Sequence, residues 1–347
     1  MSPPTAEAAL QRVLDQGRAR ATATDPEHAL LWDALAVAAV GGKRFRPALV
    51  SATHDALGGT CPGAAAEVGA AVELLHTAFV IHDDVIDCDD RRRGRLNVGG
   101  TFTARAASSG ASLEGAESLG RTAGILAGDL ALAAAVRAVA TCGAPTAVVH
   151  RLLDHFDVAL HTTAAGELAD VGLAVRVSAA SLPESLDMEE KKTSAYSFVL
   201  PLQAGAVLAD ADETTVRGLA RVGSRLGIAF QLVDDLLGVF GDPVVTGKSA
   251  TSDLRTRKQT PLLAHARTTA EWDRISQYVG RDLDDEELDD VRRLLTCSGS
   301  RQFVEELAEI HLVEARDAVA EMGLPPDLLA SVSLPAVTPA GSDHVAA

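Results

Sequence analysis

Apolar residues recur along this chain at the three- and four-residue spacing of helices, and few segments alternate as strands do. Ala, Leu and Val fill most of these positions, because aromatic residues make up only 3% of the chain. Helix starts are marked too, as at Asp25-Pro26, an N-cap followed by a proline at the first helical position. The pattern predicts an all-α protein. The expected helices cover residues 8–21, 26–40, 47–57, 64–87, 122–141, 145–173, 188–208 and 213–238, with two or three more ending near 322.

Segments without this periodicity are expected to be loops or tails. Residues 97–118, rich in Gly, Ser, Thr and Ala, predict a loop or a broken helix. Loops are also expected at 178–185, which contains Pro183, and at 239–260. Residues 323–347 carry four prolines and little periodicity, which predicts a disordered tail. We therefore expect one domain over 1–347, with its core at about 8–322.

Composition excludes several classes of protein. The chain has 347 residues, is 47% hydrophobic and has a formal net charge of −17. A general nucleic-acid surface is not expected, because such binding requires a basic face. The four cysteines are scattered, which is typical of reduced structural thiols. No secretory signal is visible, and charges interrupt the apolar runs, so we expect a cytoplasmic protein without a transmembrane segment.

The strongest chemical signal is Glu73–Gly94, where an apolar helix ends in carboxylates. Asp83 and Asp87 are four residues apart and share one face of a helix, with Asp84 beside them. Three acids at a helix C-terminus oppose the macrodipole and require a compensating cation. Carboxylate oxygens suit magnesium, and the arginines that follow suit phosphate oxygens. This segment predicts a magnesium-bridged diphosphate site.

A second acidic pair, Asp234 and Asp235, follows Gln231 near the end of another apolar helix. We expect the two acidic clusters to face one cavity and to hold several magnesium ions around one diphosphate. His76 lies on the helical stripe of Asp83 and is a candidate phosphate donor. Basic candidates lie at helix ends or in Gly- and Pro-rich loops: Lys43, Arg46, Arg92, Arg93, Lys192, Lys248 and Lys258. Outside the site we place Arg44 as a structural residue, and Arg91, Asp89 and Asp90 as solvated charges.

Five segments together resemble the short-chain trans-polyprenyl diphosphate synthases, which are class I isoprenoid synthases. GGKRFRP resembles the family's GGKRxRP, and HDDVIDCDDRRRG its first aspartate-rich motif with the RRG that follows. KKTSAYSF resembles the KT motif, FQLVDDLLGVFGD the second aspartate-rich motif, and GKSATSDLRTRKQT the GKxxGxDLRxGKxT loop. The match runs from about residue 30 to 270. The resemblance implies the isoprenoid synthase fold, a single-domain antiparallel helical bundle around a central apolar cavity.

Carried over position by position, the resemblance implies a prenyltransferase that condenses isopentenyl diphosphate with an allylic diphosphate. Magnesium would be bound by Asp83, Asp87 and Asp234, supported by Asp84 and Asp235, and three ions are expected. Isopentenyl diphosphate would be held by Lys43, Arg46, His76 and Arg93. The allylic diphosphate would be held by Arg92, Lys192 and Lys248, with Lys258 nearby. Thr193 and Gln231 would flank the reacting carbons and stabilise the allylic cation.

The sequence departs from the family pattern at several positions. Gly238 stands where the second motif has its last aspartate, and Asp242 is a candidate to assist. If the first aspartate of that motif is the essential ligand, activity survives; if the fifth is needed, magnesium affinity falls. Glu167 stands where glutamine is common. The other departures are Leu96-Asn97, Thr251 and Arg257.

Product length is expected to depend on the residues that precede Asp83. In the family, a small residue five positions before the first aspartate admits a longer chain. Ala78 occupies that position and favours the twenty-carbon geranylgeranyl diphosphate, whereas Phe79 leaves the fifteen-carbon farnesyl product open. At 1.5 Å per residue these side chains lie about 6–8 Å from Asp83 along the helix.

Two rival functions share parts of this pattern. A terpene cyclase would have the helical fold and one acidic motif, but would usually lack the isopentenyl diphosphate residues and a second aspartate cluster. A non-catalytic prenyl-diphosphate-binding subunit is suggested only by Gly238. The family also implies a homodimer, although no hydrophobic stripe in the sequence identifies its interface.

Overall fold

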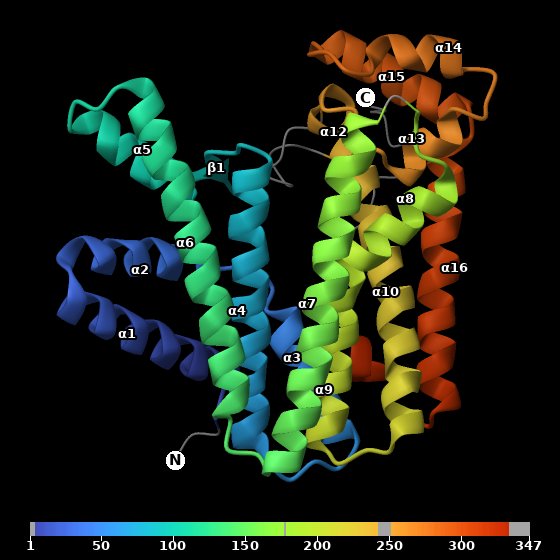
Figure 1. Cartoon of the computed structure of the whole chain (residues 1–347). Helices are drawn as coiled ribbons and strands as arrows, with labels where there is room; N and C mark the ends of the chain where they lie inside the picture. The colour runs from blue at the N-terminus through green and yellow to red at the C-terminus, as the bar shows by residue number, and fades with distance from the viewer. Residues whose placement is uncertain (1–3, 177, 242–250, 333–347) are drawn as a thin grey trace, which may run out of the picture. The chain divides into compact units, whose positions relative to one another are not determined.

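The structure is a computed structural model that describes residues 4–176, 178–241 and 251–332 (Figure 1). Nearly all of the described chain is helical, which confirms the predicted all-α class. The described residues form two compact units. Among the described residues, the first unit comprises 4–158, 200–219 and 327–331, and the second comprises the others.

The first unit is built around α4, Pro62–Ile86. Its other elements are α1 Ala6–Thr24, α2 Pro26–Ala39, α3 Phe45–Ala56, β1 Arg91–Arg92, β2 Arg95–Leu96, α5 Val98–Ser108, α6 Leu113–Ala140 and α9 Leu200–Leu208. Helix α4 packs against α1, α3 and α6, and α3 packs against α9. The predicted cap at Asp25 is present, since its carboxylate accepts a 2.7 Å hydrogen bond from the Glu27 backbone N–H.

Small residues let α6 approach α4 closely. A Cβ atom at Gly124 would collide with the side chain of Val85, and one at Gly128 would collide with that of His82. Figure 1 shows the two helices running side by side.

Both helices are also long and apolar enough to cross a membrane. In α4, however, 78% of the most apolar 18-residue window is buried inside the protein, as in the core helix of a soluble protein. The buried share of the corresponding window of α6 is 50%.

The second unit has its core around the C-terminal part of α10. Leu232 and Leu236 on α10 pack with Leu262, Val291 and Val304 in one buried apolar cluster. The elements of this unit are α8 Leu182–Glu189, the π-helix η1 Glu190–Val199, α12 Ser252–Arg255, α13 Pro261–Ala266, α14 Trp272–Ile275, the 3-10 helix η2 Ser276–Tyr278, α15 Asp285–Cys297 and α16 Ser300–Glu321. Helices α7 Thr146–Val175 and α10 Glu213–Phe240, and the 3-10 helix η3 Pro326–Leu329, contribute residues to both units.

Several elements differ from the sequence prediction. Residues 97–118 form two helices, α5 and α6, so the broken helix was the correct alternative. Helix α8 begins inside the expected loop 178–185, because Ser181 and Glu184 form a capping box that the prediction overlooked. Most of the expected tail, and Lys248 and Asp242 of the expected loop, lie outside the described residues.

Candidate active site

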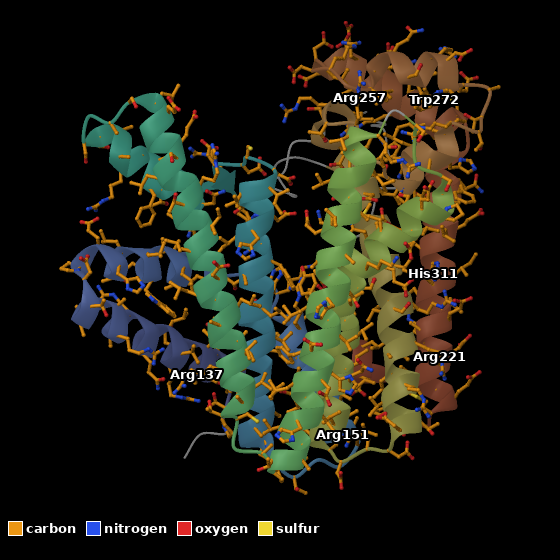
Figure 2. All side chains as sticks on the ribbon, in the orientation of Figure 1. Arg137, Arg151, Arg221, Arg257, Trp272 and His311 are labelled. Atoms are coloured by element: carbon orange, nitrogen blue, oxygen red, sulfur yellow. The ribbon has the colours of Figure 1, made fainter. Side chains whose placement is uncertain are left out.

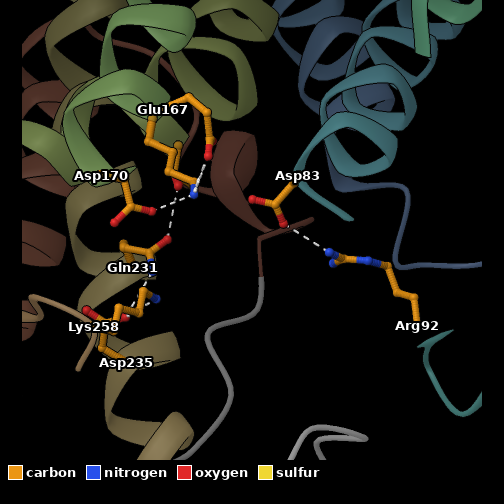
Figure 3. Close-up of polar contacts among 9 residues, drawn as sticks. Asp83, Arg92, Glu167, Asp170, Gln231, Asp235 and Lys258 are labelled. Atoms are coloured by element: carbon orange, nitrogen blue, oxygen red, sulfur yellow. Dashed lines mark hydrogen bonds and ion pairs between the residues drawn. The ribbon is translucent and has the colours of Figure 1, made fainter. Parts of the chain in front are cut away.

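The first acidic motif ends α4 and is paired with an arginine. Asp83 Oδ2 accepts a 3.0 Å hydrogen bond from Arg92 Nη2, which Figure 3 shows. Asp84 Oδ1 accepts a 2.7 Å hydrogen bond from Arg92 Nε. Asp87 is the C-cap residue of the helix and is exposed, as are Asp89 and Asp90. Burial raises the pKa of Asp84 to about 6 despite the opposing charge of Arg92. The compensating cation that the helix-dipole argument required is therefore Arg92.

A tight hairpin brings Arg92 back to the helix that precedes it. Strands β1 and β2 pair antiparallel, with Arg92 opposite Arg95. The two residues between them, Arg93 and Gly94, have φ values of 52° and 74°, the pattern of a type I′ turn. Arg93 is therefore a non-glycine residue in the left-handed region. This conformation costs energy and tends to persist at functional sites.

Arginine side chains gather around His76 in the first unit. Burial lowers the pKa of His76 well below its usual value, and the charges of Arg46, Arg93 and Arg92 lower it further. The Arg93 guanidinium lies against the Gly41–Gly42 turn, 3.4 Å from where a Gly41 Cβ would be. Three candidates for the isopentenyl diphosphate site, Arg46, Arg93 and His76, thus lie close together. The lowered pKa keeps the His76 imidazole neutral at physiological pH. Lys43, the fourth candidate, is exposed beside the same turn.

Arg44 has a structural role, as the sequence analysis expected. Its guanidinium donates a 2.7 Å hydrogen bond to the buried Glu73 carboxylate and a 2.8 Å bond to the Ala39 carbonyl. A further ion pair joins it to Glu7 at 3.0 Å. These contacts hold the start of α3 against α4 and α1.

In the second unit, the KT motif lies on the π-helix η1, which spans Glu190–Val199. π-helices are rare and are frequent at functional sites. Three glycines make room for its wide backbone: a Cβ at Gly166 would lie 2.6 Å from the Cα of Lys192, one at Gly223 2.6 Å from the Cα of Val199, and one at Gly227 2.7 Å from the Cα of Ser194. Helices α7 and α10 therefore contact the π-helix backbone directly.

Lys192 is held by two carboxylates of α7. Its Nζ lies 2.6 Å from Asp170 Oδ2 and 3.1 Å from Glu167 Oε2 (Figure 3). The glutamate that departs from the family pattern thus contributes a second negative charge to this lysine. A diphosphate that binds Lys192 must compete with both carboxylates.

Residues of η1, α10 and the following segment form a continuous polar chain. The Thr193 hydroxyl donates to Gln231 Oε1 at 3.1 Å, and Gln231 Nε2 donates to Asp235 Oδ1 at 3.1 Å. Lys258 Nζ donates to the same Asp235 oxygen at 3.1 Å. Four candidate residues from three motifs therefore form one network, with Asp234 next to it on α10 and partly exposed.

Glu189 is buried beside this network and was missed by the sequence analysis. Only 2% of it is exposed, and neither of its carboxylate oxygens has a hydrogen-bond partner; the same is true of Asp235 Oδ2. Burial, and then the negative charge of Asp235, raise the pKa of Glu189 well above its usual range. A proton on Glu189 can be donated to Asp235, which would satisfy both groups.

Comparison with known proteins identifies the family. Residues 29–296 match the polyprenyl synthetase family. The chain belongs to this family. It is 34% identical over 292 residues to (2E,6E)-farnesyl diphosphate synthase of Mycobacterium tuberculosis, covering 82% of this chain and 75% of the relative. It is 32% identical over 327 residues to geranylgeranyl diphosphate synthase of the same organism, covering 92% and 87%.

Solved structures agree with this assignment. A geranylgeranyl pyrophosphate synthase from Corynebacterium glutamicum, complexed with isoprenyl diphosphate and magnesium, has a TM-score of 0.86 at 27% identity, and the match covers 94% of each chain. The family resemblance of the five motifs and the isoprenoid synthase fold are thereby confirmed. This polyprenyl synthetase is a short-chain trans-prenyltransferase.

The acidic residues fit magnesium, the ion bound in the Corynebacterium relative. Among the described residues, no group of three or more His, Cys, Asp or Glu side chains is already arranged to hold a metal ion. The donors are nevertheless carboxylate oxygens, the ligands that magnesium prefers. Asp235 Oδ2 is buried without a hydrogen-bond partner, and burial raises the pKa of Asp84 to about 6. At each carboxylate, a bound divalent cation would offset the cost of burying the negative charge.

The residues expected to set product length lie on α4 below Asp83. Ala78 is 1% exposed and faces the protein interior, whereas Phe79 is partly exposed. The small side chain therefore lies on the buried face of the helix.

Three acidic residues of the second unit were not among the predicted site residues: Glu167, Asp170 and Glu189. Asp170 and Glu189 were treated as ordinary helix residues, although the first contacts Lys192 and the second lies against the Gln231 network. Glu167 was noted only as a departure. A signal was available: Glu167 and Asp170 are three residues apart and so share one helix face.

Proposed function

We propose that this prenyltransferase condenses isopentenyl diphosphate with an allylic diphosphate to form geranylgeranyl diphosphate. The observation that supports two diphosphate substrates is the set of cations in the first unit: Arg92 pairs with the Asp83 and Asp84 carboxylates, and Arg46 and Arg93 join it in acting on His76. A terpene cyclase uses one diphosphate and needs only Arg92 from this set. The Corynebacterium relative, a geranylgeranyl pyrophosphate synthase, is complexed with isoprenyl diphosphate.

In the proposed reaction, the C–O bond of the allylic diphosphate breaks and the diphosphate leaves with the electron pair. Magnesium, when bound, neutralises the charge that develops on this leaving group. Asp83, Asp87 and Asp234 would hold the metal, supported by Asp84 and Asp235, and Arg92 and Lys192 would bind the phosphate oxygens. The double bond of isopentenyl diphosphate then attacks the allylic cation to form the new C–C bond, and the departed diphosphate accepts the proton whose loss restores an alkene.

Neutral polar groups would guide the cationic step. The hydrogen bond from Thr193 to Gln231 Oε1 orients two oxygen atoms without adding charge. Such dipoles can stabilise an allylic cation without trapping it as a covalent adduct. His76, kept neutral by burial and by nearby arginines, can donate a hydrogen bond to isopentenyl diphosphate without protonating the alkene.

One assay tests this function. Purified protein is incubated with magnesium, isopentenyl diphosphate and a farnesyl, geranyl or dimethylallyl primer, and the products are separated by chain length. The proposal predicts elongation to twenty carbons that stops when magnesium is chelated. A cyclised hydrocarbon would instead identify a terpene cyclase, and binding without turnover would identify a non-catalytic subunit.

Replacing Ala78 by Phe should shorten the product. The larger side chain would fill space on the buried face of α4 below Asp83, and we expect farnesyl diphosphate to replace geranylgeranyl diphosphate as the main product. Over-packing of this kind costs about 1–3 kcal/mol, so the melting temperature should be measured alongside the product distribution. If the variant folds and its products are unchanged, Ala78 does not limit chain length. A Phe79→Ala variant then tests the neighbouring residue.

We also infer that the enzyme is a homodimer that contacts its partner through α6. One face of α6 is exposed and apolar: Leu119 is 44% exposed and Leu126 48% exposed, and Ala133 and Ala140 follow at the same seven-residue spacing. This spacing is typical of helix–helix contacts. A shallow groove of about 650 Å³ runs along the same face.

The charges on the edge of this groove suit a second copy of the chain. Asp129 and Arg137 both line it and lie four residues on either side of Ala133 (Figure 2 labels Arg137). In a two-fold antiparallel pairing centred on Ala133, each Asp129 would lie opposite the partner's Arg137.

The four cysteines are free, which supports a reducing compartment and hence the cytoplasm.

An Ala133→Arg substitution should separate the dimer. The long cationic side chain would lie at the centre of the proposed contact in both copies. We expect each copy to weaken the free energy of dimerisation by about 2 kcal/mol or more. Sedimentation velocity at micromolar concentration should show monomers for this variant and dimers for the wild type. Gln11→Arg, on the exposed side of α1, is the matched control. A dimeric Ala133→Arg protein would place the interface elsewhere.

A further inference from the structure

Lys192 is contacted by more negative charge than the family pattern provides. Its Nζ lies 2.6 Å from Asp170 Oδ2, 3.1 Å from Glu167 Oε2 and 3.2 Å from Glu167 Oε1, so both oxygens of the glutamate lie beside the lysine (Figure 3). The glutamine that is common at position 167 would be neutral and could offer only one oxygen acceptor. Glu167 therefore adds a full negative charge to this lysine.

The elements around the lysine hold this glutamate in place. Glu167 and Asp170 are three residues apart on α7 and lie on one face of the helix. Gly166, the residue before Glu167, lets the α7 backbone approach the η1 backbone, since a Cβ there would lie 2.6 Å from the Lys192 Cα. The two carboxylates therefore reach Lys192 from a closely packed neighbouring helix.

Water screens these charges only in part. The side chains of Lys192, Glu167 and Asp170 are 24%, 22% and 18% exposed, respectively. Partly buried charges are screened much less than charges in open solvent. Two carboxylates and one ammonium group also leave one net negative charge beside the position where a diphosphate oxygen is expected to bind. The second carboxylate must therefore weaken the attraction of Lys192 for an anion.

One carboxylate is enough to orient a lysine of this π-helix. Asp170 makes the shorter contact with Lys192, at 2.6 Å, and Asp187 contacts the neighbouring Lys191 at the same distance. A neutral side chain at position 167 would leave the Asp170 contact in place. The main effect of Glu167 on Lys192 is therefore its charge.

We propose that Glu167 weakens the hold of Lys192 on the allylic diphosphate and thereby speeds the release of primer and product. The inference rests on the proposed function, in which Lys192 binds that diphosphate, and deepens it by giving a role to the departure at position 167. The product of each elongation step is itself an allylic diphosphate, so the same charge acts on substrate and product. Glu167 acts on the substrate only through Lys192, and isopentenyl diphosphate, which other cations hold, is not affected.

The alternative is that Glu167 holds Lys192 in the conformation that binds diphosphate. The two roles predict changes of opposite sign. If Glu167 supplies only an opposing charge, removing the charge tightens the binding of an allylic diphosphate. If Glu167 is needed to orient the lysine, the same change loosens the lysine and weakens binding.

The experiment measures the binding of geranyl diphosphate to the full-length protein by calorimetric titration, with magnesium and without isopentenyl diphosphate, so that no elongation occurs. The variants are Glu167→Gln, Glu167→Ala, Glu167→Asp, Lys192→Gln and the double variant Glu167→Gln/Lys192→Gln. Asp187→Asn, which removes the carboxylate paired with the neighbouring Lys191, is the matched control. Initial rates give the KM for each substrate, and the melting temperature without ligand reports the structural effect of each substitution.

We expect Glu167→Gln and Glu167→Ala to bind geranyl diphosphate about three- to tenfold more tightly than the wild type, the scale of one charge interaction between partly exposed groups. The KM for isopentenyl diphosphate should stay within about twofold of the wild-type value, because distant sites act independently. Glu167→Asp keeps the charge and should bind more weakly than Glu167→Gln. In the Lys192→Gln background, Glu167→Gln should change the affinity by less than about twofold. Asp187→Asn should bind as the wild type does.

Several results would overturn the inference. They are folded Glu167→Gln and Glu167→Ala proteins that bind geranyl diphosphate no more tightly than the wild type, an equal gain in Glu167→Asp or Asp187→Asn, or an equal gain in the Lys192→Gln background. These leave the proposed function intact if the wild type elongates isopentenyl diphosphate. Undiminished binding by Lys192→Gln would remove Lys192 from the allylic site, and the inference with it. A wild type that neither binds geranyl diphosphate nor elongates it would overturn the proposed function as well.

Discussion

Asp83→Ala should lower the rate of chain elongation by at least about 10²–10³-fold, the loss typical when one group that stabilises a transition state is removed. Asp83 is expected to bind the metal that neutralises the leaving diphosphate, and it also pairs with Arg92 at 3.0 Å. The substitution leaves the 2.7 Å contact between Arg92 and Asp84, so the hairpin should keep its anchor. Turnover should therefore fall far more than stability does.

The measurement compares elongation rate and melting temperature in the same preparation. Because Asp83 is partly exposed, loss of its ion pair should cost no more than about 1 kcal/mol. Asp90→Ala, which removes an exposed carboxylate just beyond the helix, is the matched control and should be active. A fully active Asp83→Ala enzyme would remove Asp83 from the reaction, and a variant that unfolds would show that Asp83 is needed for folding.

The helices could be predicted from the sequence because their signals are local. The 3.6-residue pattern and the Asp25-Pro26 start signal predicted where α2 begins. The glycine pair Gly41-Gly42 predicted its end to within two residues. The segment 97–118 was harder, since its Gly, Ser and Thr residues weaken the pattern. Its helices are visible only in three dimensions, where glycines such as Gly120 allow α5 and α6 to approach each other closely.

The exposed face of α6 shows what the sequence could not reveal. Buried residues such as Ala127 and Ala131 face the protein, while Leu126 and Ala133 face outward, so the helix is apolar on both sides. A hydrophobic pattern identifies an interface only when the rest of the helix is polar. On α6 nothing in the sequence separates core positions from the proposed dimer surface.

Candidate residues within one unit were recognised from motifs, but their mutual contacts were not. The chain of hydrogen bonds from Thr193 through Gln231 and Asp235 to Lys258 joins three motifs distant in sequence. Glu189 lacks any local signal, because a glutamate before a lysine pair usually remains in solvent. Its significance comes only from complete burial against Asp235.

Two lysines among the candidate site residues of the second unit are held by carboxylates. Lys192 lies between Asp170 and Glu167, and Lys258 contacts Asp235. A negatively charged protein that binds diphosphate needs such paired cations, since its overall field repels the substrate. The pairing keeps each lysine extended and oriented, so that substrate binding exchanges one set of oxygen partners for another.

The same lysine also depends on a glycine, and Gly166→Ala should reduce both stability and turnover. A Cβ at position 166 would lie 2.6 Å from the Lys192 Cα and 2.6 Å from the Lys191 carbonyl carbon, and both are backbone atoms that no side-chain rotation can move. The π-helix must therefore shift. Over-packing should cost about 1–3 kcal/mol, and a shift of about 1 Å at Lys192 should lower the rate by about 10²-fold.

Gly172→Ala is the matched control, because it makes the same substitution on the same helix, six residues further along. No atom lies within 4 Å of its Cβ position, so the added methyl group meets no resistance. Removing a glycine from a helix should then stabilise the protein by about 0.5–1 kcal/mol. Chemical denaturation should show a loss of stability for Gly166→Ala and a gain for Gly172→Ala, and only Gly166→Ala should lower the elongation rate. If both behave alike, the contact between α7 and the π-helix does not position Lys192.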